Sequence, residues 1–355
     1  MPRLAGTSVL PEVEADIADR LSRLGYIIRF ERFKASPRAL VAVASAGAAC
    51  GWVVLISAPF LVVDFPGWSV AITGFAALLF VMMLAFGIAD GVVPQRWPEV
   101  DATNICAQRA DKPALWLVAH CDSKGQGVSL AGRVMAVATL GTGLSILVVD
   151  LLARIFTPLP WWAVAPAVLL TVMGGAVLSR GVVSNDSPGA VDNATGVVAA
   201  LVAAEHLRHR HDVGVLVTGA EEFAMAGARA WVTTTGANGS FINFDGIDSL
   251  GRHRVMIHGS QRHGSADRSR EIAEAVADAL ASAGTEVVRR GLPPGVIVDG
   301  VALNRAGMPG VTVSRGSWRT LQVVHTKSDR SERVDVGAAV SAGRAAAKAV
   351  EILLG

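Results

Sequence analysis

The sequence predicts an open α/β fold that is interrupted by two pairs of membrane-spanning helices. Short apolar runs such as LWLVAH and VGVLVTGA end at imidazole or acidic side chains, as buried strands do where they enter loops. Charge-free segments long enough to cross a bilayer separate some of these runs. Hydrophobic residues make up 52% of the 355-residue chain and charged residues only 17%, so we expect a membrane part beside a catalytic part.

The elements of the catalytic part follow from local periodicity. The stretch DIADRLSRLGYIIRFERFKA predicts an amphipathic helix and then a strand. The chain resumes after the first apolar insertion with ATNICAQ and LWLVAH, which both predict strands. Residues 335–354, which are rich in alanine, predict a closing amphipathic helix.

The first two apolar segments, residues 39–63 and 66–89, contain no charged side chain, and each is long enough to cross a bilayer core. The turn DFPG joins them, and Trp68 lies at a segment end, where interfacial tryptophans anchor. Since the buried helices of soluble domains rarely stay uncharged for so long, these segments predict a transmembrane hairpin.

The second pair of apolar segments runs from Val134 to about Phe156 and from Trp161 to Ser179. Asp150 and Arg154 interrupt the first member, but they lie on the same helical face and can neutralise one another near the membrane surface. We expect this pair to span the membrane as well. A hydrophobic hairpin lying on the membrane surface is the alternative.

The catalytic part is therefore predicted to be discontinuous. It comprises residues 1–38, 91–130 and 181–355, while the hairpins occupy residues 39–90 and 131–180. Because each hairpin crosses twice, every fragment of the catalytic part is predicted to lie on one side of the membrane.

Lysine and arginine distribution predicts which side that is. The opposite turns offer only Arg154, whereas the catalytic side carries Arg32, Lys34, Arg38, Arg96, Lys124, Arg133 and Arg180. The positive-inside rule then predicts an integral protein of the inner or plasma membrane with a cytoplasmic catalytic part. Three cysteines, an odd number, agree with a reducing compartment, and the polar, acidic opening residues predict no signal peptide. The sequence contains no basic patch interleaved with aromatic residues, so it does not predict a nucleic-acid partner.

Six imidazole and carboxylate groups lie where predicted strands give way to loops: His120, Asp192, Glu221, Glu222, Asp245 and His325. Parallel strands share one rim at their carboxyl ends, so groups distant in sequence converge there. Imidazole and carboxylate are ligands that zinc accepts, and a carboxylate can bridge two ions. Taken singly, the aspartates could cap helices, the glutamates could favour a helix macrodipole and His325 could lie in a surface turn. Taken together, they predict a two-metal site.

Spacing also predicts which of these groups bind metal and which orient a ligand or transfer a proton. Asp122 lies two residues beyond His120 in an extended segment, hence on the same side, where it can accept the proton of the second imidazole nitrogen. Glu221 and Glu222 are adjacent, so their carboxylates leave an extended chain in different directions. One can bind metal while the other transfers a proton.

The contexts of these residues, in order, are AHCDS, GAVDNATG, TGAEEFAMAGARAWV, NFDGIDSLG and HTKSDRSERVD. They resemble the co-catalytic zinc aminopeptidases of the bacterial leucyl aminopeptidase type, metallopeptidase family twenty-eight, whose fold the glutaminyl cyclases share. The resemblance implies a mixed, largely parallel sheet with helices on both faces, and two zinc ions. It also implies residue roles: Asp192 bridges, His120 and Glu222 or Asp245 are terminal ligands, His325 is the second imidazole, Glu221 is the general base and Asp122 orients His120.

We therefore expect a membrane-embedded zinc exopeptidase, specifically an aminopeptidase that acts on peptides and contacts membrane lipid. A glutaminyl cyclase-like acyltransferase and a non-catalytic membrane module or transporter are the alternatives. Asp299, in VDGVALNRAGMPGVTV, aligns loosely with a family aspartate near the pocket, and we assign it no role. The sequence predicts no particular oligomeric state.

Overall fold

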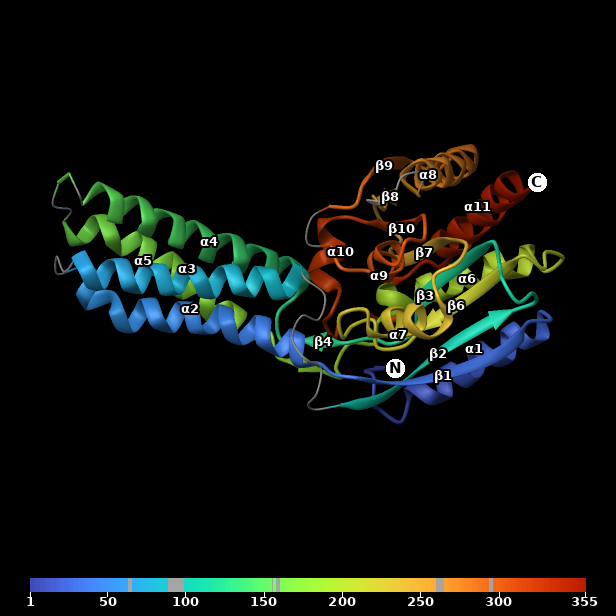
Figure 1. The fold of residues 1–355 in the computed structure, drawn as a ribbon, viewed down its shortest axis with the longest axis horizontal. Helices are drawn as coiled ribbons and strands as arrows, with labels where there is room; N and C mark the ends of the chain where they lie inside the picture. Colours follow the sequence, from blue (N-terminus) through green and yellow to red (C-terminus); the bar gives the residue numbers. More distant parts are fainter. Residues whose placement is uncertain (63–65, 89–98, 155, 158–159, 260–264, 294–295) are drawn as a thin grey trace. The chain divides into compact units, whose positions relative to one another are not determined.

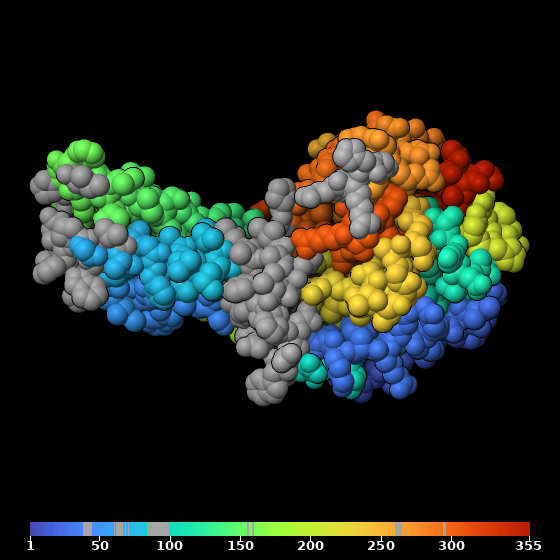
Figure 2. Space-filling model, viewed as in Figure 1, coloured from blue at the N-terminus to red at the C-terminus, as the bar shows by residue number. Residues whose placement is uncertain are grey.

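The computed structural model describes residues 1–62, 66–88, 99–154, 156–157, 160–259, 265–293 and 296–355. The chain divides into two compact units (Figure 1). Unit 1 comprises Met1–Pro37, Gln95–Gly125 and Ser184–Gly355, and unit 2 comprises Arg38–Pro94 and Gln126–Val183. Within unit 1, segments far apart in the sequence, near residues 1–35, 220–240 and 300–320, form one continuous surface (Figure 2).

Unit 1 is built on an eight-stranded mixed sheet, which confirms the predicted α/β fold. In order across the sheet, its strands are β1 (Ile27–Ala35), β2 (Val100–Gln108), β6 (Val213–Thr218), β3 (Leu115–His120), β7 (Ser240–Ile247), β10 (Gly310–Gly316), β8 (Arg252–Ile257) and β9 (Val287–Gly291). The four central strands β6, β3, β7 and β10 are parallel, as are β8 and β9. The pairs β1–β2, β2–β6 and β8–β10 are antiparallel.

The central strands are buried on both faces, which is why their sequences are nearly continuous apolar runs. On one face, α7 (Ala226–Thr235) and α9 (Asp299–Arg305) pack against Trp116 and Val118 of β3. The rings of Trp116 and Trp231 meet edge to face with centroids 4.9 Å apart. Successive side chains of a strand point to opposite faces, so the intervening residues of β3 meet the helices of the other face.

The other face of the sheet is covered by α6 (Thr195–His206), which packs against β3, β6 and β7. The closing helix α11 (Val336–Leu354) packs on α6 and on α8 (Ser265–Ser282). The opening helix α1 (Leu10–Arg23) and the short α10 (Trp318–Val323) complete the described α-helices of unit 1, which also contains a π-helical turn, η1 (Ala190–Ala194), and a 3-10 turn, η2 (Ser331–Arg333). A two-stranded sheet, β4 (Gly125–Gln126) with β5 (Val183–Ser184), forms where the chain passes between units.

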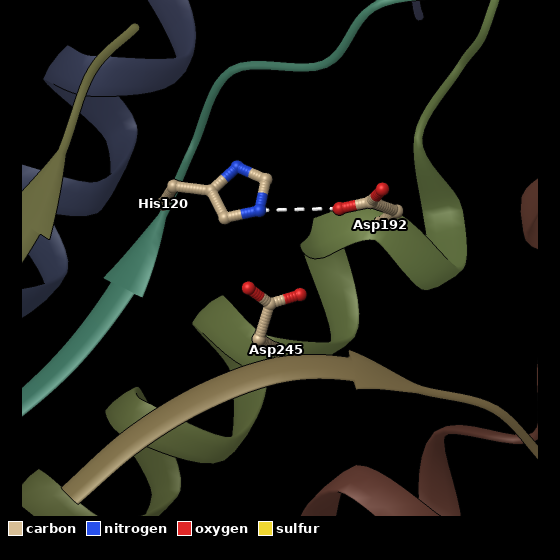
Figure 3. Close-up of side chains that lie close together, drawn as sticks. All are labelled: His120, Asp192 and Asp245. Carbon is tan, nitrogen blue, oxygen red and sulfur yellow. Dashed lines mark ion pairs between the residues drawn. The ribbon is translucent and has the colours of Figure 1, made fainter. Parts of the chain in front are cut away.

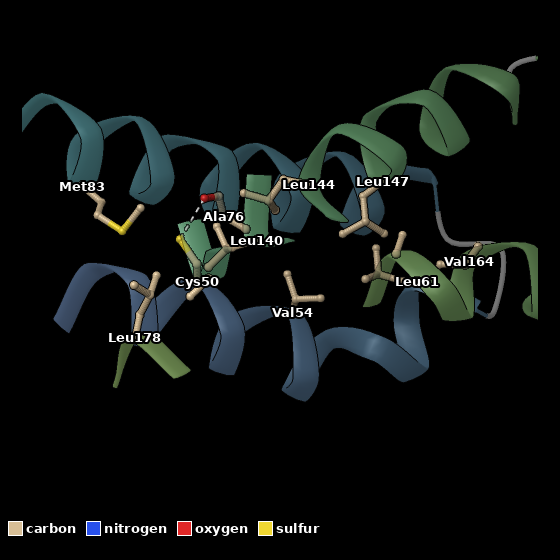
Figure 4. Packing of buried hydrophobic residues seen from close by; sticks show 12 residues of the cluster. Cys50, Val54, Leu61, Ala76, Met83, Leu140, Leu144, Leu147, Val164 and Leu178 are labelled. Carbon is tan, nitrogen blue, oxygen red and sulfur yellow. Dashed lines mark hydrogen bonds between the residues drawn. The ribbon is translucent and has the colours of Figure 1, made fainter. Parts of the chain in front are cut away.

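Unit 2 consists of the four apolar helices α2 (Arg38–Val62), α3 (Pro66–Ile88), α4 (Leu130–Ala153) and α5 (Trp161–Leu178). They enclose a core of twelve buried apolar residues that includes Cys50, Leu140 and Leu178 (Figure 4). At one crossing, a Cβ atom on Gly175 would lie 2.7 Å from the Cα of Gly51, so only glycine lets α2 and α5 approach this closely.

Within the described part of the chain, two helices are long and apolar enough to cross a membrane, and they are α4 and α5. The described apolar stretches of α2 and α3, Ser45–Pro59 and Ala71–Met83, are shorter. Four transmembrane helices are expected from the sequence; length and composition make α4 and α5 candidates, and the crossing of a membrane by any of the four stays a prediction. The first half of the DFPG turn and Arg96 lie outside the described residues.

Candidate metal centre

The candidate site forms at the carboxyl ends of the parallel strands, where the sheet topology brings separate segments together. His120 is the last residue of β3, and Glu221 and Glu222 lie in the turn between β6 and α7. Asp245 does not close its strand as predicted: β7 continues to Ile247. The register between β7 and β10 shifts here: Val313 pairs with Phe244 and Arg315 with Ile247, so β7 carries one extra residue and its pairing with β10 continues beyond Asp245.

His120 is buried, and its ring is fixed by the residue two positions further along the chain. The Nδ1 atom lies 3.1 Å from the carbonyl oxygen of Asp122 and 3.5 Å from its carboxylate. The carboxylate also accepts the backbone N–H groups of Glu221, at 3.1 Å, and Glu222, at 3.3 Å. Asp122 thus ties the end of β3 to the glutamate turn and leaves Nε2 of His120 directed into the site (Figure 3).

Asp192 lies at the centre of the site, between two imidazoles. Its Oδ1 is 3.1 Å from Nε2 of His120, and its Oδ2 is 2.9 Å from Nε2 of His325. The side chain caps no helix, because α6 begins two residues after Asn193 without a side-chain cap. His325 follows α10 and is buried, so the alternative of a surface turn residue is wrong.

Two groups of possible ligands share this aspartate. In the first, one atom each of His120, Asp192 and Asp245 lie within 4.8 Å of one another (Figure 3). In the second, the same holds for Asp192, Glu222 and His325. The sequence left open whether Glu222 or Asp245 completes a ligand set. In the structure Asp245 lies in one of the two possible ligand groups and Glu222 in the other.

The backbone around Asp192 is held by residues to which the sequence interpretation gave no role. The carboxylate of Asp329 accepts the N–H groups of Val191, at 2.7 Å, and Asp192, at 3.2 Å. The Asn193 side chain donates to the carbonyl of Phe244 and accepts the N–H of Gly246, and the Asp192–Asn193 peptide bond is cis. Asp329 closes the HTKSD motif that begins with His325, and this proximity was the available signal for it.

Lys124 lies in the candidate site, where the sequence interpretation did not place it. It was counted among the cations that flank the membrane, but its side chain is buried and its Nζ lies 2.5 Å from Oε2 of Glu222. The lysine occupies one oxygen of Glu222, and the other oxygen lies 3.4 Å from Nε2 of His325. Its position four residues after His120, inside the same loop, was the signal that favoured the site.

The site carries more carboxylates than cations, and the pKa values reflect that excess. Burial raises the pKa of Asp245 to about 8, and the charges of Asp192, Asp299 and Glu222 add to the shift. The pKa of Glu222 falls to about 2 in spite of burial, because Lys124 and His325 stabilise its charged form. Burial also raises the pKa of Glu221 well above its ordinary value.

Asp299 is placed beside the site by the start of α9. It is buried, one carboxylate oxygen accepts the hydroxyl of Thr218 at the end of β6, and the other oxygen has no hydrogen-bond partner among the described residues. Burial raises the pKa of Asp299 to about 6. Asp299, to which the sequence analysis assigned no role, therefore lies close enough to the candidate ligands for its charge to affect them.

These residues fit a divalent cation. Nε2 of His120 and Oε1 of Glu222 are buried and lie against other candidate ligands, 3.1 Å from Oδ1 of Asp192 and 3.4 Å from Nε2 of His325, so donor atoms of separate segments are gathered in one place. Imidazole nitrogen and carboxylate oxygen are the donors that zinc and related ions bind, and bound cations would balance the carboxylates. Glu221, with Oε2 3.9 Å from Nε2 of His120, lies beside the ligand groups without belonging to either.

Comparison with known proteins agrees with this arrangement. Residues 171–350, half of the chain, match the model of peptidase family M28. The chain belongs to that family. The matched region contains five of the six candidate site residues of the sequence analysis, and His120 precedes it. None of the curated proteins matches the sequence.

Solved structures share the fold at low sequence identity. The glutaminyl cyclase of Fimbriiglobus ruber superposes with a TM-score of 0.55 at 15% identity, covering 99% of this chain and 90% of that one. The zinc aminopeptidase of Bacillus subtilis gives 0.53 at 13% identity, covering 99% and 91%. The zinc-dependent exopeptidase of Parabacteroides distasonis gives 0.52 at 13% identity, covering 98% and 91%. These likenesses establish the fold and leave the reaction open.

Proposed function

We propose that this protein is a zinc-dependent aminopeptidase that uses two metal ions and is anchored in a membrane by its apolar helices. One observation carries the proposal: two possible ligand groups share Asp192, and a separate buried carboxylate, that of Glu221, lies beside them. The family and the zinc exopeptidases among its structural neighbours support a zinc hydrolase.

The residues divide into ligands and a proton carrier. His120, Asp192 and Asp245 would hold one ion, and Asp192, Glu222 and His325 would hold the other. Bound zinc lowers the pKa of water and polarises a carbonyl oxygen. Glu221 would accept the proton of the attacking water and return it to the leaving amine. Asp122 keeps His120 in the tautomer whose Nε2 is free to bind, since Nδ1 donates to the Asp122 carbonyl.

The charge of the site supports exopeptidase action at an amino terminus. Five carboxylates, of Asp192, Glu221, Glu222, Asp245 and Asp299, lie in or beside the two ligand groups, whereas Lys124 is already paired with Glu222. Once the ligand carboxylates balance the bound ions, the buried oxygen of Asp299 that has no hydrogen-bond partner among the described residues remains to accept an N–H group of an amino terminus, which a free carboxylate does not have. Glutaminyl cyclisation is the alternative reaction, since the structural neighbours include glutaminyl cyclases and an amino-terminal glutamine would meet the same groups.

The membrane part of the proposal rests on unit 2. Its helices are apolar on the outside as well as inside, with Trp52, Phe75 and Leu152 more than half exposed, and helices that are hydrophobic all round are typical of membranes. The glycine contact between α2 and α5 is the kind of packing that transmembrane helices use. We infer that all four helices span the membrane and that unit 1 is cytoplasmic.

The reaction is tested on the full-length protein purified in detergent. We expect metal analysis to give two zinc ions per chain and aminoacyl anilides to be hydrolysed, with activity lost on chelation and restored by zinc. Release of ammonia from glutaminyl peptides without anilide hydrolysis would favour the cyclase. A protein that binds zinc and does neither would contradict both reactions.

The topology is tested by cysteine labelling in a background that lacks Cys50, Cys106 and Cys121. We expect cysteines at Gly67 and Thr157 to react with an impermeant thiol reagent in intact cells, because the positive-inside rule places these turns outside. A cysteine at the exposed Ser331 should react only after lysis. Labelling of position 331 in intact cells would reverse the orientation.

A further inference from the structure

The first residues of the chain enter the interior of unit 1 next to the candidate metal centre. Arg3 is 7% exposed, and its backbone pairs with Ser123: the Arg3 N–H donates to the serine hydroxyl at 3.0 Å, and the Ser123 N–H donates to the Arg3 carbonyl at 3.1 Å. The chain therefore runs alongside the loop that follows His120 before α1 begins.

The Arg3 guanidinium donates to carbonyls of two different loops. Its Nε lies 2.8 Å from the oxygen of Cys121, in the loop of His120 and Asp122. Its two Nη atoms lie 2.6 Å from the oxygen of Pro188 and 2.9 Å from that of Gly189, in the loop that leads to Asp192. One side chain thus connects the segments that carry the first imidazole and the shared aspartate.

The two loops that Arg3 connects are closely packed against each other. Gly189 has a φ of 62°, and a Cβ atom there would lie 2.4 Å from Cβ of Ser123 and 2.5 Å from the carbonyl oxygen of Asp192. The Ser123 hydroxyl also donates to the carbonyl of Ser187 at 3.0 Å. Because the acceptors are backbone atoms in close-packed loops, the guanidinium fixes the main chain on both sides of the site.

We propose that Arg3 is a positioning residue that sets the separation of His120 and Asp192 and thereby the affinity for the ion they would share. The inference rests on the metal centre of the proposed function and adds a residue outside it. Burying a guanidinium is costly, and its four carbonyl acceptors together with the charges of Asp122, Asp192 and Asp329 offset that cost.

Arginine is required by the geometry rather than by its charge alone. A guanidinium offers five N–H donors in a fixed plane and can serve two loops at once, whereas the lysine ammonium is a single point on a flexible stem. Arg3→Lys therefore keeps the positive charge and loses the connection. If charge were the whole effect, this variant would behave as the native protein does.

Arg109 provides a matched control in the same unit. Its guanidinium also donates to backbone carbonyls of separate segments, those of Leu24, Leu207 and Arg210, and it stacks over the ring of Tyr26. None of these residues is a candidate site residue. Arg109→Lys should lower the melting temperature and leave metal affinity unchanged.

The experiment compares native protein, Arg3→Lys, Ser123→Ala and Arg109→Lys, all full length in detergent and loaded with zinc. The readouts are zinc affinity by chelator competition and the melting temperature of the metal-free protein. We expect Arg3→Lys to weaken the affinity for at least one zinc ion by about 10- to 100-fold, the usual loss when a partner behind the ligands is removed. Ser123→Ala, which retains the guanidinium, should weaken it less.

Native zinc affinity in both Arg3→Lys and Ser123→Ala would overturn the proposal, as would an affinity loss in Arg109→Lys equal to that in Arg3→Lys. If Arg3→Lys does not fold, Ser123→Ala decides alone. A native protein that binds zinc but cleaves no anilide contradicts the proposed reaction and leaves the affinity comparison intact. A native protein that binds no zinc overturns both proposals.

Discussion

Both units of this chain bury apolar side chains, but only unit 1 also buries charged ones among the described residues. Unit 1 places charged groups, among them Asp122, Glu221 and Glu222, in its interior, and its surface carries the ion pairs typical of a water-exposed protein. In the described part of unit 2, no charged side chain is fully buried, and the outward face is as apolar as the interior. Unit 1 thus gathers charged groups in its interior, whereas unit 2 exposes the apolar side chains on which the proposed membrane anchoring rests. The comparison teaches that each unit must be tested by its own type of substitution.

The largest effect is expected in unit 1 from Glu221→Gln. The amide keeps the shape of the carboxylate but cannot accept the proton of the attacking water, so turnover should fall by a factor on the order of at least 10². Zinc content should stay native, because Glu221 belongs to neither ligand group. Glu205→Gln, at an exposed position of α6, is the control and should keep native turnover. Native turnover in Glu221→Gln would remove Glu221 from the mechanism.

The shared aspartate distinguishes one ion from two. Asp192→Asn should weaken both metal positions by more than about 100-fold, since even partners outside the ligand set cost 10- to 100-fold. Asp245→Asn and Glu222→Gln should each weaken one position, because each lies in a single ligand group. Metal stoichiometry of the three variants checks this. Full occupancy of both positions in Asp192→Asn would contradict the bridging role.

A matched pair of lysine substitutions tests the contrast between the units directly. Leu78 in α3 and Leu250 in unit 1 are similarly exposed, at 54% and 50%. Leu78→Lys should cost about 3 kcal/mol of membrane insertion and lower the yield in the membrane fraction. Leu250→Lys should change stability by no more than about 0.5 kcal/mol, as surface substitutions do. Equal behaviour of the two variants would show that unit 2 lies in water.

The smallest of these effects is expected from Asp122→Asn. The asparagine keeps the main-chain carbonyl that accepts from Nδ1 of His120, but it weakens the bonds to the N–H groups of Glu221 and Glu222. We expect zinc affinity or turnover to fall by roughly 10- to 100-fold. A loss as large as that of Asp192→Asn would indicate that Asp122 binds the metal itself.

Part of the site could be predicted because the end of a buried strand can be recognised from the residues immediately around it. The apolar runs that end at His120 and before Glu221 become β3 and β6, and the parallel sheet brings their ends together. The extent of β7 beyond Asp245 could not be predicted, since the strand with which Ile247 pairs, β10, lies about 70 residues away in the sequence. A strand's length is decided by its neighbours.

The residues that hold the site from behind were the least predictable. Lys124 adjoins an apolar segment, so its sequence context favoured a membrane flank, and only the folded chain brings it to Glu222. Arg3 acts through backbone carbonyls 118 to 186 positions away. Every residue has a backbone carbonyl, so the residue types do not indicate which carbonyls accept these hydrogen bonds. Such partners are found by geometry alone.

The strand order of the sheet also limits how this protein can be made. In space β6 lies between β2 and β3, but it follows both hairpins in the sequence. While the ribosome is still making unit 2, β2 and β3 are already synthesised and lack the strand that joins them. Domains otherwise tend to fold from the amino terminus during synthesis. Here β6 follows both hairpins, so all four helices of unit 2 have left the exit tunnel before the sheet can close, and under the proposed membrane anchoring they are available for insertion before unit 1 has folded.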